Sequence, residues 1–518
     1  MSRDQLHSGF SVSWLRRSVV GLFASKILAS VAVLFAGMLL LRYLEPSEYG
    51  YYQVVISIAS FTMTVFSLGF SPLISRFIPE LLERGNSRTA AKFLLIVLAI
   101  RAVLITMLLL IGLVFFESIE SFFGLGDVDK YGSLAISAIV LGTYLGSSVG
   151  PVVLGAYARQ VEIGIGSVIS AVLRIVVIGL VVIFDFGLVG ILIAISIVEI
   201  VMLLGYLARV FFVVSIQTHE KDESISESLK VRAFRYSIPL SLVSAARFFE
   251  SRFGMIFVIS SSLGTAAAGN YSFVFVMLQF GAIVNPVYTL NTLIDNVIVR
   301  RSVHLDQKEL LARGQRMFIS LSVYTGVPIA LYLLVIRAPL SQAFGFEHAG
   351  TGWLFLWAGL FFITNSMQLA YGNIFTQLEV PKYRLLFGAI GILGVGIAFS
   401  IIHEYGIVGV AAVAGISSSL VLLVQHWISR KILRVPVGIY PAMLFKVFAI
   451  NAIAGMATST VVFLSDRFVP TALITFSVFI VIYLALTFIM KPFSKEDVKS
   501  LQAILPGWTR VVLGPMLR

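Results

Sequence analysis

The sequence predicts an all-α protein that crosses a membrane many times. Of its 518 residues, 58% are hydrophobic and only 12% are charged, which is about half the charged fraction of an ordinary soluble domain. The mean hydropathy is +0.97, so too few polar side chains exist to cover a soluble fold of this length. The sequence also has no Cys, which removes thiol chemistry and Cys-ligated zinc. A polytopic membrane protein is the class that remains.

Fourteen apolar stretches are long enough to cross the hydrocarbon core as helices, which takes about 20 residues each. They are 18–41, 49–70, 93–116, 131–157, 160–183, 188–213, 236–260, 267–290, 317–336, 351–373, 384–402, 406–429, 441–464 and 470–490. Strands of a membrane β-barrel would instead give alternating segments of about 10 residues. The stretches therefore predict about fourteen transmembrane helices, called spans 1 to 14 below.

The basic residues between the spans indicate the orientation of the chain. One set of alternate loops holds only Arg42, Lys130, Arg337 and Arg467, whereas the other set and the two termini hold most of the 38 Lys and Arg residues. By the positive-inside rule, we expect both termini in the cytoplasm and the chain in the inner or plasma membrane of the cell. The net charge of +12 then reflects topology and contact with anionic lipids, not nucleic-acid binding.

An internal repeat relates the two halves of the chain. Residues 44–52 (LEPSEYGYY) match 263–271 (LGTAAAGNY), and 186–197 (FGLVGILIAISI) match 405–416 (YGIVGVAAVAGI) at the same offset of 219 residues. The matches align Gly50 with Gly269, Tyr52 with Tyr271, Gly187 with Gly406 and Gly190 with Gly409. Because the offset covers six spans, both halves enter the membrane in the same direction. This is the parallel repeat of several secondary transporters.

The repeat predicts the domain organisation. We expect an N-lobe at 1–214 with spans 1–6, a cytoplasmic inter-lobe linker at 215–235, a C-lobe at 236–434 with spans 7–12, and spans 13 and 14 with a cytoplasmic amphipathic tail at 435–518. The two six-helix lobes are expected to surround a central cavity. Helical apolar spacing at 74–82 and in the tail from Ser494 predicts two amphipathic helices lying in the membrane interface.

The residues quoted above resemble a known family. The segment 43–92, with LEPSEYGYY and then SLGFSPLISRFIPELLERGN, and the YGIVGVAA run at 405–412 resemble the Wzx-type oligosaccharide flippases of polysaccharide biosynthesis. The resemblance extends over all fourteen spans. These flippases belong to the multidrug/oligosaccharidyl-lipid/polysaccharide exporter superfamily, which also holds lipid II flippases and the MATE multidrug exporters.

The resemblance implies a function. It implies translocation of a polyprenyl-diphosphate-linked oligosaccharide from the cytoplasmic to the outer leaflet, for O-antigen, capsule or exopolysaccharide synthesis. The implied mode is alternating access between two lobes around a cationic cavity, without catalysis and without a cofactor. Proton, sodium and membrane-potential coupling stay open as alternatives. Membrane lipids are implied contacts, and a polysaccharide polymerase and glycosyltransferases are candidate partners.

Basic residues within the spans are the candidates for binding a diphosphate. Each costs about 2.5–3.5 kcal/mol near the bilayer centre, and Arg binds phosphate bidentately while keeping its charge. Arg247 and Arg252 lie near the middle of span 7, where Glu250 can pair with Arg247 but cannot easily neutralise both. We predict that Arg247 and Arg252 bind the diphosphate. The alternative is a salt bridge that joins two helices.

Two further basic residues complete the predicted site. Lys26 in span 1 is assigned to the cavity because the family places the first span beside it. Arg174 in span 5 faces two interpretations, namely phosphate binding or a structural ion pair with Glu199 of span 6. Glu199 and Glu250 are accordingly predicted as ion-pair or ion-coupling residues. The His residues and the acidic residues form no cluster with metal-ligand spacing, so no metal site is predicted.

Two other functions compete with the flippase. A MATE-like, cation-coupled exporter of small molecules or drugs would need acidic groups in the N-lobe, whereas the mid-span carboxylates are limited to Glu199 and Glu250. A membrane enzyme such as a polymerase or ligase would need a sizeable outer loop with acid–base groups. The longest outer loops, 117–130 and 337–350, have only about fourteen residues. The sequence therefore favours the flippase, with the exporter as the alternative.

Overall fold

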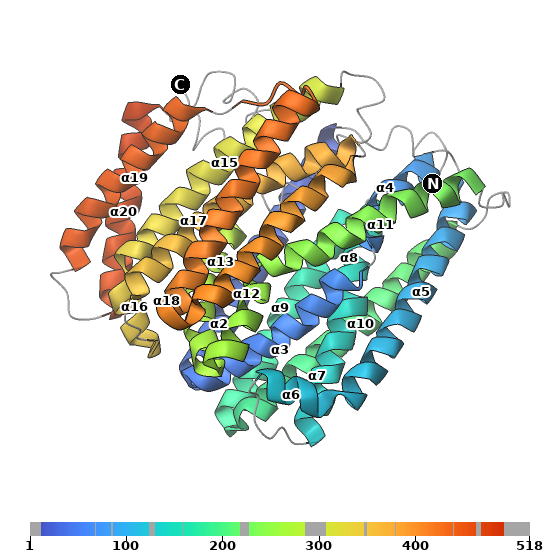
Figure 1. Ribbon diagram of the computed structural model, residues 1–518, viewed down its shortest axis with the longest axis horizontal. Coiled ribbons are helices and arrows are strands. Elements are labelled where there is room, and N and C mark those ends of the chain that lie inside the picture. The colour runs from blue at the N-terminus through green and yellow to red at the C-terminus, as the bar shows by residue number, and fades with distance from the viewer. Residues whose placement is uncertain are drawn as a thin grey trace. The chain divides into compact units, whose positions relative to one another are not determined.

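The helices of this protein form two compact units. The computed structural model describes residues 12–67, 69–83, 86–123, 130–157, 159–217, 227–284, 307–346, 350–378, 380–438, 440–462 and 468–491. This part of the chain consists of helices and connecting turns and contains no strand (Figure 1). The larger unit comprises residues 28–273 and 379–414, and the smaller unit comprises 1–27, 274–378 and 415–518. The all-α membrane fold that the sequence predicts is confirmed.

The larger unit contains the helices of spans 1–7, the start of span 8, and, from 379–414, η2 (Pro381–Tyr383) and the first part of α18 (Arg384–Trp427), which hold span 11 and the start of span 12. The helices of spans 1–8 are α2 (Val12–Tyr43, whose first part belongs to the smaller unit), α3 (Pro46–Val65), α4 (Phe70–Glu83), α5 (Ser87–Val114), α6 (Phe116–Phe123), α7 (Lys130–Gly142), η1 (Thr143–Ser147), α8 (Ser148–Ala156), α9 (Gln160–Phe184), α10 (Gly187–Gln217), α11 (Glu227–Glu250), α12 (Arg252–Leu263) and the first part of α13 (Thr265–Val284). Helix α10 packs against α7 and α9, and α3 packs against α11 and α12.

The amphipathic segment predicted at 74–82 forms helix α4, but its apolar face does not lie against lipid. Ile74, Phe77 and Ile78 are at most 1% exposed and belong to the hydrophobic core of the larger unit. Helix α4 packs against α5, α8 and α11, so neighbouring helices cover its apolar face. Protein therefore covers the apolar face that we expected lipid to cover, and the depth of this helix in the membrane stays a prediction. Hydrophobic spacing reveals an apolar face but not whether protein or lipid covers it.

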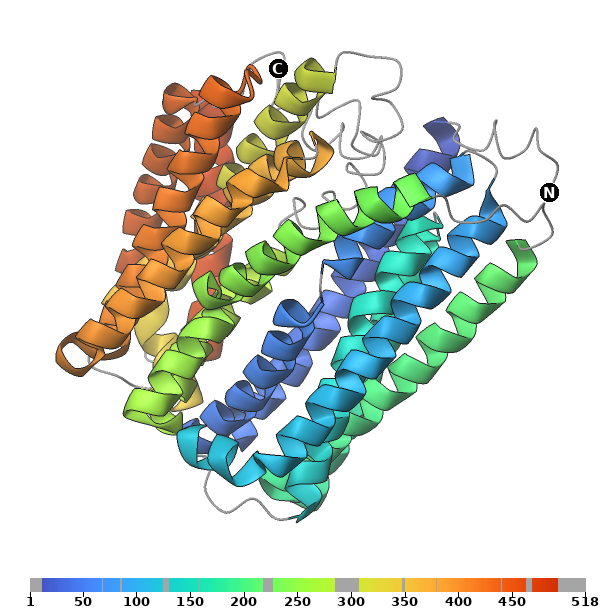
Figure 2. The same cartoon turned by 45° about the vertical axis from the view of Figure 1, so that its right-hand side comes forward.

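The smaller unit contains the helices of spans 9, 10, 13 and 14. They are α15 (Gln307–Val335), α16 (Arg337–Phe344), α17 (Thr351–Gln377), α19 (Pro441–Val462) and α20 (Phe468–Met490), together with the second part of α18 (Arg384–Trp427) and η3 (Ile428–Ile432). Helices α19 and α20 form an antiparallel pair, orange to red in Figure 2, and α15 packs against both α17 and α19. Buried hydrogen bonds reinforce this packing, because Tyr371 accepts from Gln315 Nε2 at 2.9 Å and lies 2.9 Å from His426 Nδ1.

Each predicted span lies in helical segments of the described chain, most of them in a single helix. Nine helices of the described chain are long and apolar enough to cross a membrane, and three shorter apolar helices accompany them. The structure departs from continuous helices in three places: span 4 contains the π-helical turn η1, span 7 is divided into α11 and α12, and spans 11 and 12 run together as α18. The end of span 8 at 285–290 and the tail from Ser494 lie outside the described residues. The predicted lobe boundaries stay a prediction.

Two glycines that the repeat aligns share an unusual backbone conformation. Gly187 begins α10 with a φ of 63°, and Gly406 interrupts α18 with a φ of 57° and a ψ of −150°. A side chain with a Cβ rarely adopts this region, so glycine is required by the backbone. In both copies of the repeat, a glycine with a positive φ therefore stands at the start of the span, at Gly187 before span 6 and at Gly406 before span 12.

Replacing Gly406 with Ala tests this requirement. A Cβ at Gly406 would meet no atom within 4 Å, so the cost arises from the backbone conformation alone. We expect Gly406→Ala to lower the free energy of unfolding by about 1–3 kcal/mol, measured as a lower midpoint of thermal unfolding in detergent. Gly396→Ala in the same helix is the control, since that site is also open and has helical backbone. Equal midpoints for the two variants would contradict the expectation.

Candidate functional site

Span 7 is interrupted in the middle of its apolar stretch. Helix α11 ends at Glu250, Ser251 adopts an extended conformation with a φ of −71° and a ψ of 162°, and α12 begins at Arg252. The two helices are labelled in Figure 1, and the bend between them is visible in the green ribbon of Figure 2. The prediction of one continuous helix across this span is therefore wrong. Interrupted helices in transporters are a recurrent way to build a polar site inside the membrane.

Local chemistry explains how the chain tolerates this break. The Ser251 hydroxyl caps α12 by accepting a hydrogen bond from the backbone N–H of Gly254 at 3.4 Å, and it donates to the carbonyl of Phe248 at 2.5 Å. A Cβ at Gly254 would approach the Phe248 carbonyl oxygen to 2.6 Å, so only glycine fits there. In the sequence, only Ser251 followed three residues later by Gly254 indicates that a new helix begins here, because Ser is a favoured N-cap residue.

Aromatic packing holds the two halves of span 7 in place. The ring of Phe61 on α3 lies 5.1 Å from Phe248 on α11 and 5.8 Å from Phe257 on α12. Phe257 in turn lies 4.7 Å from Phe123 on α6. Centroid separations of this size give favourable edge-on and tilted contacts. The bend is thus braced by rings from α3 and α6.

The interruption places Arg252 in an incompletely satisfied environment. Its Nε and Nη1 atoms are buried, and the described part of the chain provides neither of them with a hydrogen-bond partner. Its guanidinium carbon lies 4.4 Å from the centre of the Phe253 ring, a cation–π contact that offsets part of the desolvation. Burial of a charge without hydrogen bonds is unfavourable. Two N–H donors of Arg252 are therefore available to an anionic ligand.

Three tyrosines lie near enough to this guanidinium to interact with its charge. Tyr49 and Tyr52 from α3 and Tyr271 from α13 all lie within interaction range of Arg252. Gln53 Nε2 donates to the Tyr49 hydroxyl at 2.9 Å, which orients that tyrosine. In the sequence, Tyr52 and Tyr271 stand out only as aligned positions of the repeat, and Tyr49 does not stand out because tyrosine is common in membrane helices. The structure assembles the three with Arg252 from three helices.

An ion pair lies next to this group. Arg174 Nη2 on α9 donates to Glu199 Oε1 on α10 at 2.5 Å, and the two side chains are 34% and 4% exposed. The ion pair that the sequence analysis offers as one interpretation of Arg174 and Glu199 is present. Tyr52 lies within electrostatic range of Arg174, Glu199 and Arg252. These residues form one polar cluster in the larger unit, which we call the Arg252 cluster: Arg252, Tyr49, Tyr52, Tyr271, Arg174 and Glu199.

The other predicted site residues have different positions. Arg247 is half-buried on the last turn of α11, and its carbonyl accepts from the backbone N–H of Ser251 at 3.1 Å. Glu250 ends α11, and its side chain is outside the described part. Lys26 is half-buried on the part of α2 that belongs to the smaller unit. Roles in ligand binding for these three residues stay predictions.

Another intramembrane arginine has a structural position. Arg101 on α5 is fully buried, donates from Nη2 to the carbonyl of Tyr144 at 2.8 Å, and lies 4.5 Å from the centre of the Tyr144 ring. The Tyr144 hydroxyl donates to the carbonyl of Phe66 at 2.7 Å. Tyr144 lies in the π-helical turn η1, so this arginine joins the irregular turn of span 4 to α5.

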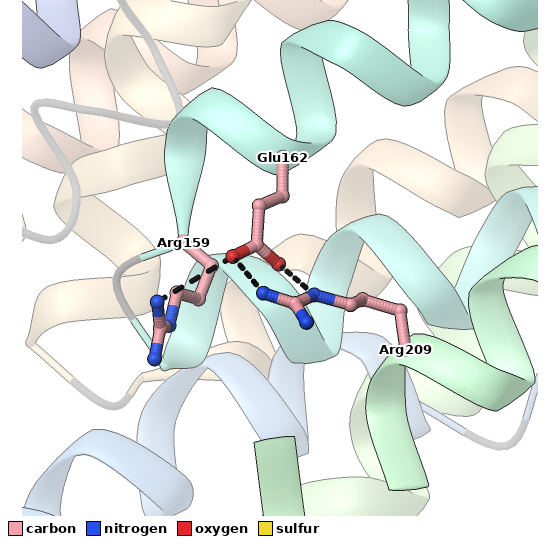
Figure 3. Close-up of polar contacts among 3 residues, drawn as sticks. All are labelled: Arg159, Glu162 and Arg209. Carbon is pink, nitrogen blue, oxygen red and sulfur yellow. Dashed lines mark hydrogen bonds and ion pairs between the residues drawn. The ribbon is translucent and has the colours of Figure 1, made fainter. Parts of the chain in front are cut away.

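Charges at the predicted cytoplasmic ends of spans 5 and 6 are paired. Figure 3 shows Glu162 on α9 accepting from Arg209 of α10 through both oxygens, at 2.7 Å from Nε and 2.6 Å from Nη2. Arg159 Nη1 lies 3.5 Å from the same carboxylate. A bidentate pair of this kind fixes the relative rotation of two helices. It is a structural contact that joins α9 to α10.

The fold is that of multi-pass membrane transporters. A mutant of the MATE transporter VcmN from Vibrio cholerae is 15% identical with a TM-score of 0.59, covering 82% of this chain and 98% of that chain. The lipid II flippase MurJ in an inward closed conformation is 16% identical with a TM-score of 0.58, covering 91% and 98%. A superfamily transporter from Pyrococcus furiosus, described as having a binding pocket of reverse polarity, is 16% identical with a TM-score of 0.57, covering 82% and 98%.

These findings identify the class and then the family. The protein has the multi-pass helical fold of these transporters and of the lipid II flippase, as the sequence predicts. Over residues 15–294, more than half of its length, the chain matches the polysaccharide biosynthesis protein family, and it belongs to that family. No curated protein sequence matches the chain.

The Arg174–Glu199 pair gives a prediction on stability. Glu199→Gln removes the carboxylate that accepts from Arg174 and leaves the guanidinium without its counter-ion. We expect the free energy of unfolding to fall by about 1.5–3 kcal/mol, the range for a hydrogen bond between charged groups. Thermal unfolding in detergent measures the change. In the double variant with Arg174→Gln, part of the loss should return, and simple additivity of the two losses would contradict direct coupling.

Proposed function

We propose that this protein is a flippase that moves a polyprenyl-diphosphate-linked oligosaccharide from the cytoplasmic to the outer leaflet of the cell membrane. Membership of the polysaccharide biosynthesis family is the observation that carries the proposal. The likeness to the lipid II flippase supports it through the fold alone. The transported unit would serve the synthesis of a surface polysaccharide such as O-antigen, capsule or exopolysaccharide.

The charges of the larger unit favour an anionic cargo. Arg252 has buried N–H donors without a described partner, and a diphosphate offers the oxygens that such donors bind best. Arg174 and Arg252 both lie within electrostatic range of Tyr52. The charge of Arg174 is balanced by its ion pair with Glu199. The Arg252 cluster therefore has a net positive formal charge. A site built for a cationic drug would have the opposite balance, which makes the MATE-like exporter the weaker candidate.

The transport requires no covalent chemistry by the protein. We infer alternating access between the two sequence-related halves, with both termini in the cytoplasm and the chain in the inner membrane. The membrane potential, a proton or a sodium ion would drive the step, and Glu199 is the candidate for ion coupling. Glycosyltransferases would supply the repeat unit on the cytoplasmic side of the membrane, and a polysaccharide polymerase would consume it on the outer side.

Deletion of the gene tests the function directly. Organic-solvent extracts of the deletion strain would be analysed for polyprenyl-diphosphate oligosaccharides, and their leaflet would be probed with a membrane-impermeant reagent. We expect completed repeat units to accumulate in the cytoplasmic leaflet while surface polymer is lost. Normal intermediates with intact polymer, in a host without a second flippase, would contradict the proposal and favour the small-molecule exporter.

Substitution of Arg252 tests the site. Arg252→Gln removes the positive charge but keeps a polar side chain, and we expect the export rate to fall about 10- to 150-fold, as for the loss of a charged hydrogen bond of about 1.5–3 kcal/mol. Export of surface polysaccharide is compared at matched expression. Arg313→Gln is the control, because Arg313 pairs with Glu309 on an exposed surface, where its side chain is 72% exposed. Full export by Arg252→Gln would remove Arg252 from the site.

A further inference from the structure

A chain of buried hydrogen bonds ends at a histidine in the smaller unit. Gln315 on α15 and Tyr371 on α17 are each 1% exposed, and Gln315 Nε2 donates to the Tyr371 hydroxyl at 2.9 Å. The same hydroxyl lies 2.9 Å from Nδ1 of His426 on α18. The positive-inside pattern of the sequence puts these parts of the three helices on the cytoplasmic side. The hydrogen bonds therefore connect a titratable ring to a buried amide near the cytoplasm.

The hydrogen-bonding capacity of each group fixes the direction of this chain. The Nε2 of a glutamine can only donate, so the Tyr371 oxygen accepts from Gln315. The single hydroxyl proton of Tyr371 then needs an acceptor, and the only one that the described residues offer is Nδ1 of His426. A buried hydroxyl is rarely left without a partner. His426 is thus held as the neutral ring, with its own proton on Nε2.

The other end of the chain reaches the segment that connects span 12 to span 13. Gln315 Nε2 also lies 3.5 Å from the carbonyl oxygen of Gly438. Val435 and Val437 in the same segment are only 1% and 4% exposed, so this non-helical stretch is packed into the smaller unit. The amide of Gln315 therefore joins α15 both to the tyrosine and to the segment 433–438.

The charged surroundings of His426 do not favour a second proton on its ring. Arg430 on η3 lies within electrostatic range of the ring, and no acidic residue of the described chain acts on it. On the side of α15, the Arg316 guanidinium lies 4.7 Å from the centre of the Tyr440 ring, and Tyr440 lies within electrostatic range of Tyr371. Since no described carboxylate balances the added charge, a second proton must be accommodated by a change in the hydrogen bonds.

Gln315 has the acceptor that this change requires. Its Oε1 is buried, and the described part of the chain provides it with no hydrogen-bond partner. Rotating the amide by half a turn exchanges Oε1 with Nε2 and hardly alters the shape of the side chain. The rotated amide would present Oε1 to the Tyr371 hydroxyl. The same rotation would take Nε2 away from the carbonyl of Gly438.

We propose that His426 is a proton-binding site on the cytoplasmic side, and that proton binding releases the segment 433–438 from α15. A proton from cytoplasmic water binds Nδ1, and the new N–H donates to the Tyr371 oxygen. The Tyr371 hydroxyl turns to donate to Gln315 Oε1, and Gln315 Nε2 leaves the carbonyl of Gly438. The site gains one positive charge, and no proton travels beyond the ring. Because the segment connects α18 to α19, its release slows export when the cytoplasm becomes acidic.

Hydrogen exchange tests the release of the segment. Deuterium uptake of a peptide that covers 433–438 is followed by mass spectrometry in the full-length protein and corrected for the intrinsic effect of pH. The N–H of Val435, which donates to the carbonyl of Ser429 at 3.0 Å, reports on the segment. Because an imidazole changes charge between about pH 8 and about pH 5, we expect corrected exchange to be about three- to tenfold faster at the lower pH, as for the loss of one hydrogen bond. Equal corrected exchange at both values would overturn the proposal.

Three variants assign the response to this chain of hydrogen bonds. His426→Gln has no titratable ring, and Tyr371→Phe lacks the hydroxyl that connects the ring to Gln315, so neither protein should show the difference in exchange. His403→Gln is the matched control, because His403 is an exposed histidine elsewhere on α18, and the full difference should persist. A pH response that survives in the His426→Gln protein would overturn the proposal. If Tyr371→Phe fails to fold, the comparison of the two histidine variants decides.

Export of surface polysaccharide gives the functional readout. A permeant weak acid lowers the cytoplasmic pH of intact cells, and we expect export by the unsubstituted protein to fall at least threefold more than export by His426→Gln at matched expression. Equal losses in the two strains would overturn the proposal.

The exchange measurement separates this inference from the proposed function, because it requires no knowledge of the cargo. If exchange responds to pH as expected while the deletion strain keeps normal lipid-linked intermediates, the proton site stands and the proposed cargo falls. If the deletion strain accumulates the repeat unit while exchange does not respond to pH, the flippase stands and the proton site falls.

Discussion

The cost of holding a charge inside the membrane-spanning part of the chain is the constraint on which the larger unit depends. An arginine there costs several kcal/mol unless other groups replace its hydration. Arg101 meets the cost with a carbonyl and the ring of Tyr144, and Arg174 meets it with the carboxylate of Glu199. Arg252 has an aromatic ring and nearby tyrosines, and no described residue provides it with a carboxylate partner. Of these three arginines, Arg252 has the least compensation for its charge, which is the property expected of a residue that binds an anionic ligand.

The break in span 7 follows from the same constraint. Inside hydrocarbon every backbone N–H and C=O must find a partner within the protein, and the end of a helix leaves several of them open. The Ser251 hydroxyl provides a partner at both helix ends, since it accepts from the Gly254 N–H at the start of α12 and donates to the Phe248 carbonyl at the end of α11. Packing of the Phe61 ring against rings on both sides of the break then braces the bend. The chain thus obtains a turn in mid-span, and with it a place where Arg252 can face polar neighbours from other helices.

The sequence predicts the helices well because hydrophobic length alone decides them. It also offers a pairing with Glu199 as one of two interpretations of Arg174, since both residues lie deep in neighbouring spans and isolated charges there are costly. The division of span 7 escapes prediction because serine is common in membrane helices, and one hydroxyl with one glycine gives no periodic signal. Tyr49 escapes for a similar reason, as tyrosines are frequent and only the fold brings three of them to one guanidinium. The apolar face at 74–82 was assigned to lipid because spacing cannot distinguish lipid from protein as its cover.

The glycines of the repeat match for two different physical reasons. Gly187 and Gly406 answer a local need, since each has a positive φ at the start of a span, and a need of this kind would arise in either copy by itself. Gly50 and Gly269 answer a mutual need, because each makes room for the backbone of the other copy. Because the two glycines face each other's helices, the same close backbone contact excludes a side chain at both positions. Enlarging either glycine therefore disturbs one shared contact, which is why a single substitution should act on both halves together.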